Sequence, residues 1–266
     1  MTTRVAPASS GDLRGDHRLL VHAVCEAGEV ARRYFEAGAK SWQKNPGNPV
    51  TEADIAVDLL LRERLCADRP DYGWLSEETE DDLSRLERRR VWIVDPIDGT
   101  RAFMAGRAEF TISAGLIEEG RPILGAVLNP ITGELFEAMK DGGARCNGER
   151  LETPDAVALE DARLLASRRA LERRQGFGTL PCARFSFINS IAYRMSLVAQ
   201  NRFDATISLA KKCDWDIAAA ELIVTESGGQ AATPDGSPLR YNGRSTEHAG
   251  VVAAGPKLFR EILSRL

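Results

Sequence analysis

The first regular pattern in the chain is a helical one, from residue 19 to residue 35, where apolar side chains recur every three or four positions. This period predicts an amphipathic helix that begins at Asp16 as its N-terminal cap and ends at Gly38. Residues 1–15 are polar and show no such period, so we expect them to form a flexible arm.

A second helix is predicted to begin at Thr51. Thr51 and Asp54 have the spacing of a capping pair, and the apolar positions that follow them end before Pro70. The segment between the two helices, residues 44–49, contains two prolines and one glycine, which predicts a loop. We expect the two helices to lie side by side.

Strand patterns dominate the middle of the chain. Four consecutive apolar residues, 91–94, predict a buried strand that stops at Asp95-Pro96, because proline has no N–H for a ladder and restricts the residue before it. Three more apolar runs, separated by polar turns, predict an antiparallel meander. These strands are expected at residues 110–117, 123–128 and 134–139.

In the second half of the chain, strand and helix patterns alternate. The strands are expected at residues 163–166, 185–188, 203–208, 230–232 and 250–254, and the helices at residues 170–176, 190–200, 216–227 and 256–266. Because strands and helices alternate in both halves, we expect two closely packed α/β units. The first would span residues 16–155 and the second residues 156–266.

The composition is that of an ordinary globular protein, with 43% hydrophobic and 28% charged residues in a chain of 266. The 35 basic and 39 acidic residues leave a net charge of −4, so no overall positive field points to a nucleic-acid partner. The five cysteines are odd in number and form no CxxC pair, which indicates reduced thiols. No signal peptide is visible and no run approaches the roughly 18 apolar residues of a membrane span, so we expect a cytoplasmic protein.

The strongest candidate chemistry lies in Asp95–Thr100, which reads DPIDGT. A buried strand delivers Asp95 to its carboxyl end, where open α/β sheets usually bind ligands. Asp98 follows, and Gly99 gives the backbone freedom to turn Thr100 inward. Two carboxylates and a hydroxyl suit a divalent cation and an anion that it holds. The alternative is a strand followed by an ordinary Asp-Gly turn.

Three other acidic positions have an ordinary structural explanation when each is taken alone. Asp216 stands where a helix N-cap belongs, and Asp54 is part of a capping pair. Glu77 and Glu78 open an acidic run, and such runs are usually solvated loops. The apolar residues before Glu77 indicate instead that at least one of this pair ends a buried strand.

Taken together, these segments resemble the inositol monophosphatase superfamily of lithium-sensitive, magnesium-dependent phosphatases. Asp95–Thr100 is similar to its DPxDGT signature, and residues 215–229 are similar to its WDxAAAxxxxxEAGG signature. Glu77-Glu78 matches its acidic pair, and residues 49–54 match its VTxxD stretch. The resemblance implies an α+β fold in which two sheets and flanking helices form a layered αβαβα sandwich.

The resemblance also implies a site for two or three Mg²⁺ ions. Glu77, Asp95 and Asp98 would bind one ion, and the carbonyl of Ile97 would complete the bridge between the sites. Asp95, Asp98 and Asp216 would bind a second ion. Carboxylates that converge in one cleft repel each other unless cations neutralise them, and oxygen ligands without His or Cys favour magnesium.

Catalytic roles are implied for Asp54, Thr100 and Glu77. Asp54 and Thr100 match the family pair that orients the attacking water, and the N–H groups of Gly99 and Thr100 would hold phosphate oxygens at a helix start. Asn189 stands where the family usually has a glycine. The expected substrate-binding residues are Gly99, Thr100, Ser190, Arg194 and Asp216.

Residues 98–103 and 109–112 bring the chain closest to the bisphosphate nucleotidase branch of this superfamily. The expected function is therefore magnesium-dependent removal of the 3′-phosphate from a nucleoside 3′,5′-bisphosphate by a metal-activated water. The second phosphate then needs cations, for which Arg194 or the pair Lys211 and Lys212 are candidates. The alternative is that Arg194 lies on a helix surface and the lysines are solvated.

Two other functions stay open. One is a phosphatase for inositol 1-phosphate or another sugar or polyol phosphate. The other is a non-catalytic interaction protein that keeps the metal site and uses its basic groups, at residues 88–90 and 168–174, to bind RNA or a protein. No aromatic residues interleave with these groups, so a nucleic-acid partner is not expected. The expected partner is a small phosphorylated substrate and not a membrane, and a homodimer is left open.

Overall fold

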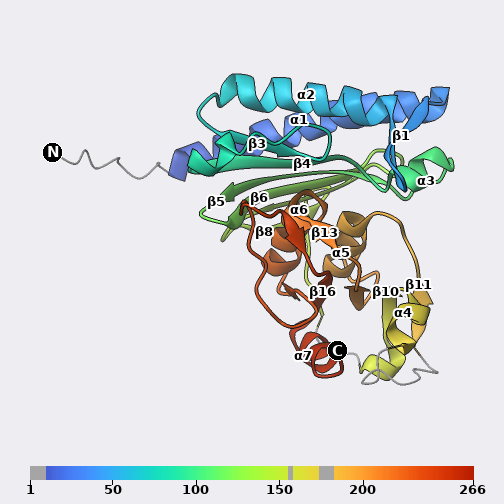
Figure 1. The fold of residues 1–266 in the computed structure, drawn as a ribbon. Coiled ribbons are helices and arrows are strands. Elements are labelled where there is room, and N and C mark those ends of the chain that lie inside the picture. The colour runs from blue at the N-terminus through green and yellow to red at the C-terminus, as the bar shows by residue number, and fades with distance from the viewer. Residues whose placement is uncertain (1–9, 155–157, 174–182) are drawn as a thin grey trace.

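The computed structural model describes residues 10–154, 158–173 and 183–266. Its helices are α1 (Ser10–Ala37), α2 (Glu52–Asp68), α3 (Thr100–Met104), α4 (Arg168–Glu172), α5 (Ile191–Ala199), α6 (Asp214–Glu226) and α7 (Pro256–Leu263), with 3-10 turns at Ser84–Glu87 and Leu159–Asp161. In Figure 1, α1 and α2 cover one face of a large sheet, and α5 and α6 lie between that sheet and a smaller one. Helices α4 and α7 pack against the smaller sheet. The predicted αβαβα sandwich is confirmed.

The larger sheet has seven strands in the order β3-β4-β5-β6-β7-β8-β9. They are β3 (Gly73–Ser76), β4 (Arg90–Asp98), β5 (Thr111–Glu118), β6 (Arg121–Asn129), β7 (Glu134–Met139), β8 (Gly143–Cys146) and β9 (Glu149–Arg150). Strands β4 to β7 are antiparallel, which confirms the predicted meander, whereas β3 pairs in parallel with β4. Alternate side chains of β4 enter different cores: Trp92 and Val94 face α1 and α2, and Val91 and Ile93 face α5 and α6.

The smaller sheet has five strands in the order β11-β10-β12-β16-β14. They are β10 (Arg163–Ala166), β11 (Arg184–Ser186), β12 (Ala205–Ser208), β14 (Gln230–Ala232) and β16 (Val251–Ala254). Two short strands, β13 (Lys212–Cys213) and β15 (Glu247–His248), pair beside it. All five strands of the smaller sheet overlap the ranges that the sequence predicts.

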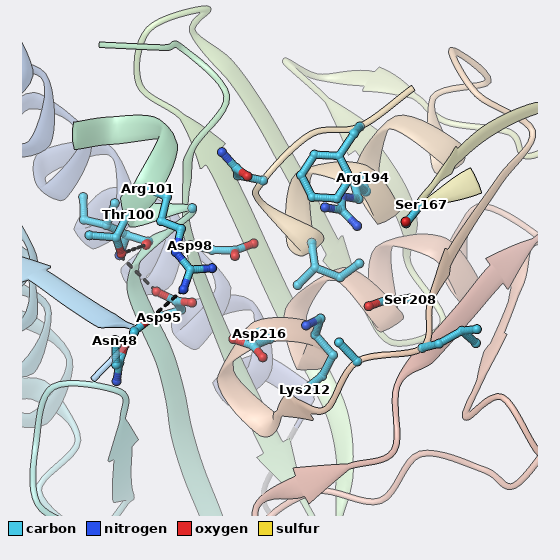
Figure 2. Close-up of a pocket in the computed structure, with 18 of the residues that line it drawn as sticks. Asn48, Asp95, Asp98, Thr100, Arg101, Ser167, Arg194, Ser208, Lys212 and Asp216 are labelled. Atoms are coloured by element: carbon cyan, nitrogen blue, oxygen red, sulfur yellow. Dashed lines mark hydrogen bonds between the residues drawn. The ribbon is translucent and has the colours of Figure 1, made fainter. Parts of the chain in front are cut away.

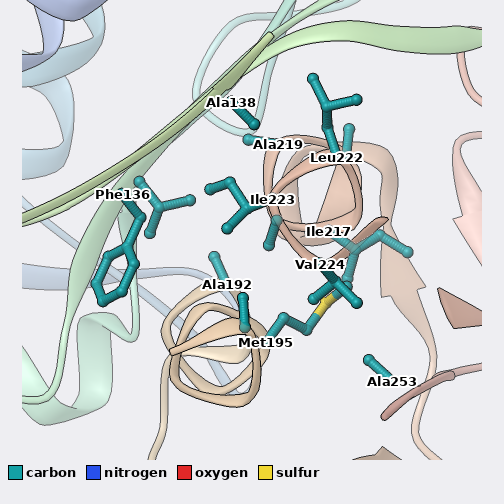
Figure 3. Packing of buried hydrophobic residues seen from close by; sticks show 14 of the residues in the cluster. Phe136, Ala138, Ala192, Met195, Ile217, Ala219, Leu222, Ile223, Val224 and Ala253 are labelled. Atoms are coloured by element: carbon teal, nitrogen blue, oxygen red, sulfur yellow. The ribbon is translucent and has the colours of Figure 1, made fainter. Parts of the chain in front are cut away.

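Helix α6 packs unusually closely on the larger sheet. A Cβ atom added at Gly125 of β6 would lie 2.5 Å from the carbonyl oxygen of Ala219, so the sheet has room for the α6 backbone only because this position is glycine. Figure 3 shows Ile217, Ala219 and Ile223 of α6 in the same core as Met195 of α5. This core fixes the start of α6 relative to the strands of the larger sheet.

Three predicted elements differ in the structure. Helix α1 begins at Ser10, so residues 10–15 are not part of a flexible arm; Leu13 packs against the core and extends the buried face. Residues 44–49 are not a loop: they contain the end of β1 (Ser41–Asn45), a turn at residues 46–47 and the start of β2 (Asn48–Thr51), which form a hairpin. Strand β4 does not stop at Asp95-Pro96, because its pairing with β5 shifts register between Asp95 and Asp98 and the bulge accommodates the proline.

Some expectations fall outside the described residues. These are residues 1–9 of the arm, the predicted boundary at residues 155/156, the end of the helix expected at 170–176, and Cys182. The other four cysteines are free thiols. Among the described residues, none of the helices is both long and apolar enough to cross a membrane.

Candidate active site

A cleft of about 670 Å³ lies where the two halves of the chain meet. It is lined by the carboxyl ends of β4 and β12, the first turns of α3, α5 and α6, and the β1–β2 turn. Figure 2 shows Asp95, Asp98 and Thr100 on one side of this cleft, Asp216 and Lys212 from the second half, and Arg194 farther along it. The cleft therefore collects side chains from segments far apart in the sequence.

Three carboxylates form a compact cluster in the cleft. Asp95, Asp98 and Asp216 each offer an oxygen within 4.8 Å of the others. Asp95 and Asp98 lie at the carboxyl end of β4, and Asp216 comes from the first turn of α6. Glu77 follows β3 and lines the same cleft, but it is not one of the three clustered residues.

Each clustered carboxylate is held by the protein through one of its two oxygens. Asp95 Oδ1 accepts from the N–H of Ile97 at 3.1 Å, and Asp216 Oδ2 accepts from the N–H of Cys213 at 2.7 Å. Asp98 Oδ2 accepts both the Ser190 hydroxyl at 2.6 Å and the N–H of Ala192 at 2.7 Å. Within residues 10–154, 158–173 and 183–266, the second oxygen of each of these carboxylates accepts no hydrogen bond and is available to a ligand.

The acidic cluster has strongly raised pKa values. Burial raises the pKa of Asp98 to about 7, and the charge of Asp216 adds to this. Burial raises the pKa of Glu77 to about 8, with Asp216 and Glu78 adding to the shift and Lys44 opposing it. The pKa of Asp95 is raised for the same reasons, burial first and then the charges of Glu77 and Asp98. A divalent cation would remove this repulsion.

The donor set fits magnesium. All candidate ligands are carboxylate or carbonyl oxygens, and hard oxygen donors suit Mg²⁺ better than zinc or copper. Ile97, whose carbonyl is predicted to complete the bridge, lines the cleft, and this carbonyl oxygen lies 3.1 Å from the Thr100 hydroxyl as an alternative acceptor to Asp54. The roles of the single residues toward each ion stay predictions.

The structure brings Asp54 and Thr100 together, as the sequence predicts. The Thr100 hydroxyl lies 3.2 Å from Asp54 Oδ1, and Asp54 Oδ2 caps α2 by accepting the N–H of Thr51 at 2.9 Å. Asp54 is 1% exposed, and burial raises its pKa although hydrogen bonds from Thr51 and Thr100 oppose the shift. Asp54 therefore reaches the cleft through Thr100.

Gly99 shapes the backbone beside these residues. Its φ is +101°, and a Cβ there would lie 3.1 Å from the carbonyl oxygen of Glu109, so the turn requires glycine. Gly99 and Thr100 line the cleft, and the part of the chain that the structure describes offers no hydrogen-bond partner to the N–H group of either. Both groups are available to an anion, and their role in binding phosphate stays a prediction.

Two predicted assignments are corrected by the geometry. Asp216 is not the N-cap of α6. Cys213 is the N-cap and the helix begins at Asp214, so Asp216 lies in its first turn. Ser190 does not line the cleft; it is fully buried, caps α5 through the N–H of Tyr193 and holds Asp98. Ser190 thus positions a candidate metal ligand instead of offering its hydroxyl to substrate.

The predicted cations separate into two groups. Arg194 and Lys212 line the cleft, so Arg194 does not lie on an outer helix surface. Lys211 is outside the cleft, where it forms an exposed ion pair with Glu247 at 2.6 Å. It drops out as a substrate contact because it precedes β13 and its amine is paired with Glu247 outside the cleft.

Three cleft-side residues escape the sequence analysis. Lys44 of the hairpin lies 2.5 Å from Glu78 and 3.8 Å from Glu77, and Arg101 binds the carbonyl of Gly47 at 2.6 Å. Phe187 lines the cleft with an exposed ring. Lys44 precedes the motif at residues 49–54 and Arg101 follows the motif at residues 95–100, but only the β1–β2 hairpin shows that their side chains point toward the cleft side. The sequence pattern around Phe187 predicts only a strand.

We expect the metal-free protein to lose stability as the pH rises from about 5 to about 8. Unfolded carboxyls ionise near pH 4, whereas in the fold Asp98 and Glu77 have pKa values of about 7 and about 8. The folded state therefore binds more protons than the unfolded state in this window, and its stability falls as they are released. Thermal unfolding in a chelator across this range measures the effect. Mg²⁺ should abolish it, and a pH-independent Tm without metal would contradict it.

Comparison with known proteins gives one consistent result. The model of the inositol monophosphatase family matches residues 16–266. The chain is 32% identical to the inositol-1-monophosphatase of Rhizobium meliloti over 262 residues, covering 93% of this chain and 95% of the relative. It is 31% identical to the 3′(2′),5′-bisphosphate nucleotidase CysQ of Aggregatibacter actinomycetemcomitans, covering 83% and 85%.

A solved structure of an inositol monophosphatase from Zymomonas mobilis has the same fold, with a TM-score of 0.79 and 30% identity over 97% of this chain and 99% of that one. The family match extends over both halves of the chain and includes every carboxylate that lines the cleft. The chain belongs to the inositol monophosphatase family and is a magnesium-dependent phosphatase.

Proposed function

We propose that the protein removes the 3′-phosphate from a nucleoside 3′,5′-bisphosphate. The observation that carries this proposal is Arg194, which lines the cleft and is only 6% exposed. Its Nε donates to the carbonyl of Ile188, and within residues 10–154, 158–173 and 183–266 it has no carboxylate in ion-pair distance. A cation of this kind is rare unless it has an anionic partner.

The energetics of Arg194 favour an anionic ligand. Burial lowers the pKa of the guanidinium, because desolvation disfavours its charged form. A phosphate group matches the planar fork of arginine and would restore the lost solvation with charge-assisted hydrogen bonds. Mg²⁺ bound by the acidic cluster would hold one phosphate group. The buried charge of Arg194 therefore favours a substrate that carries a second phosphate. Lys212 lines the same cleft and would add positive charge.

The same residues support a mechanism with water as the nucleophile. Bound Mg²⁺ lowers the pKa of water and stabilises charge on phosphate and leaving-group oxygens. Glu77, Asp95, Asp98 and Asp216 would hold the metal. The Thr100 hydroxyl, which donates toward Asp54 Oδ1, is oriented to accept a proton from the attacking water while Asp54 takes the hydroxyl proton. The free N–H groups of Gly99 and Thr100 would bind the phosphate oxygens.

The non-catalytic alternative has little support in the arrangement of its basic residues. Arg90 is 8% exposed and binds Asp16 at 3.0 Å and Glu118 at 3.0 Å, so it is a structural residue and not part of a free basic patch. Arg168 lies 3.6 Å from Glu172 and stacks on a phenylalanine ring. Arg174 lies outside the described residues.

The proposal predicts the effect of Arg194→Met, which keeps most of the side-chain volume but removes the charge. We expect kcat/KM for adenosine 3′,5′-bisphosphate to fall by about 10- to 100-fold, the usual effect of losing hydrogen bonds to a charged group. Hydrolysis of inositol 1-phosphate should change little, because it has no second phosphate. Phosphate release with both substrates measures the two effects.

Arg260→Met is the matched control, since Arg260 is an exposed arginine of α7 that does not line the cleft. Unmutated protein should prefer the bisphosphate. If it hydrolyses inositol 1-phosphate faster, or if Arg194→Met slows both substrates equally, the assignment to nucleoside bisphosphates is wrong and a polyol phosphatase is the better description.

A further inference from the structure

The cleft has two ends of different chemistry. One end holds the carboxylates and the free N–H groups beside Thr100, and it accounts for a phosphate and its metal ions. The lining also contains the apolar residues Phe187, Ala170, Leu171 and Leu209, and Figure 2 shows Ser167 and Ser208 on the side of Arg194 away from the carboxylates. In Figure 2 the acidic residues and Arg194 stand at separate places along the cleft, with Ser208 on the second side. An apolar end serves no purpose for a phosphate.

Phe187 is the most conspicuous residue at the apolar end. Its side chain is 58% exposed although it lies in the cleft, where apolar surface would normally be covered by neighbouring residues. A phenylalanine ring that stays open inside a binding cleft gives up the stabilisation that burial would provide. A ligand that covers the ring would recover it.

The ring is held in place by Arg194. The guanidinium carbon of Arg194 lies 4.3 Å from the centre of the Phe187 ring, in cation–π contact. Arg194 is itself fixed, because it is buried and its Nε donates to the carbonyl of Ile188. The guanidinium thus covers one face of the ring, and the exposed surface that remains is available to a flat ligand.

We propose that Phe187 is a stacking platform for the base of a nucleotide substrate, a role that rests on the proposed function for the position of the two phosphates. The base would lie on the ring surface that Arg194 leaves open, and the apolar residues of α4 and the end of β12 would border it. Arg194 then has two roles. The face of its guanidinium supports the Phe187 ring on which the base stacks, and its Nη atoms bind a phosphate of the same ligand. Every base has a π-face, and the larger face of a purine stacks best.

This arrangement discriminates against polyol phosphates. An inositol ring is saturated and carries a hydroxyl on each carbon that bears no phosphate, so it cannot stack and would leave the Phe187 ring and the apolar wall uncovered. The platform would therefore set substrate preference without touching the reacting phosphate. Its contribution should be visible in binding alone, in the absence of metal and of turnover.

The test compares two ligands that differ only in the base. Adenosine 5′-monophosphate and ribose 5-phosphate are titrated into the metal-free protein in a chelator, and binding is followed by calorimetry. We expect adenosine 5′-monophosphate to bind on the order of 10-fold or more tightly, the usual effect of stacking one base on an aromatic side chain. In Phe187→Leu this advantage should disappear while ribose 5-phosphate binds as before, and Phe187→Trp should restore it.

Trp42→Leu is the matched control, because Trp42 is an exposed aromatic residue, 46% exposed, that does not line the cleft. If adenosine 5′-monophosphate binds no more tightly than ribose 5-phosphate, or if Phe187→Leu keeps the advantage, the platform is overturned, whereas the bisphosphate assignment still depends on the Arg194 experiment. If the advantage depends on Phe187 but inositol 1-phosphate is the better substrate, the platform stands and the proposed reaction fails.

Discussion

Asp95→Asn is expected to lower kcat by at least 10²–10³-fold, about the loss that follows removal of one group that stabilises charge in a transition state. Asp95 is 1% exposed and lies within 4.8 Å of the oxygens of Asp98 and Asp216, so its charge acts on every ion bound in the cluster. Asparagine has the same shape and can still accept the N–H of Ile97. The fold should therefore survive.

The stability of this variant separates a metal role from a structural one. Without metal, Asp95→Asn should unfold at the same temperature as the unmutated protein or a higher one, because a buried charge in a repelling cluster is gone. The rise in Tm on adding Mg²⁺ should shrink. Asp71→Asn is the control, since Asp71 is exposed and outside the cleft. Near-normal turnover of Asp95→Asn at saturating Mg²⁺ would contradict the metal assignment.

Asp54→Asn is expected to lower kcat by about 10²–10⁴-fold, the range for loss of a group that moves a proton. Asparagine can still cap α2 through its carbonyl oxygen, but this turns its NH₂ group toward Thr100 in place of Oδ1. The Thr100 hydroxyl would then accept a hydrogen bond where it now donates one. The Mg²⁺ concentration that gives half-maximal activity should stay the same, because Asp54 is not one of the clustered carboxylates.

Two variants of Thr100 check the same proton path. Thr100→Val removes the hydroxyl and should be as slow as Asp54→Asn, whereas Thr100→Ser keeps the hydroxyl and should retain most activity. The double variant of Asp54→Asn and Thr100→Val should be little worse than either single one, because both residues act on one proton. A fast Thr100→Val enzyme would show that the water is activated elsewhere.

The fold is predictable where one face of an element is buried over several turns. The sequence predicts α2 and the strands β5 to β7 within a few residues, because each pairs locally or packs through a regular apolar stripe. It misses the first turns of α1, where Leu13 packs against the core without a repeating apolar stripe, and the β1–β2 hairpin, where no apolar alternation exists. The bulge at Pro96 depends on pairing with Thr111, which no local pattern of β4 contains.

The site is predictable only in part, because motifs identify residues but not the directions of their side chains. The sequence names every carboxylate that lines the cleft, and it names Arg194 and Lys212. It assigns Ser190 to substrate through the resemblance to the family, whereas in the structure the Ser190 hydroxyl donates to Asp98. Phe187 gives no signal, because its meaning depends on Arg194 standing beneath its ring.

The hydrogen bonds that hold one oxygen of each clustered carboxylate also bear on which ion the cleft accepts. Calcium takes six to eight oxygen ligands and commonly uses both oxygens of a carboxylate, whereas magnesium requires six and keeps several waters. Asp98 Oδ2 already accepts two hydrogen bonds, from the Ser190 hydroxyl and the N–H of Ala192, so a contact of both Asp98 oxygens with calcium would cost at least one of them. Calcium would therefore compete with the first turn of α5 for this oxygen, and the start of that helix favours the smaller ion at Asp98.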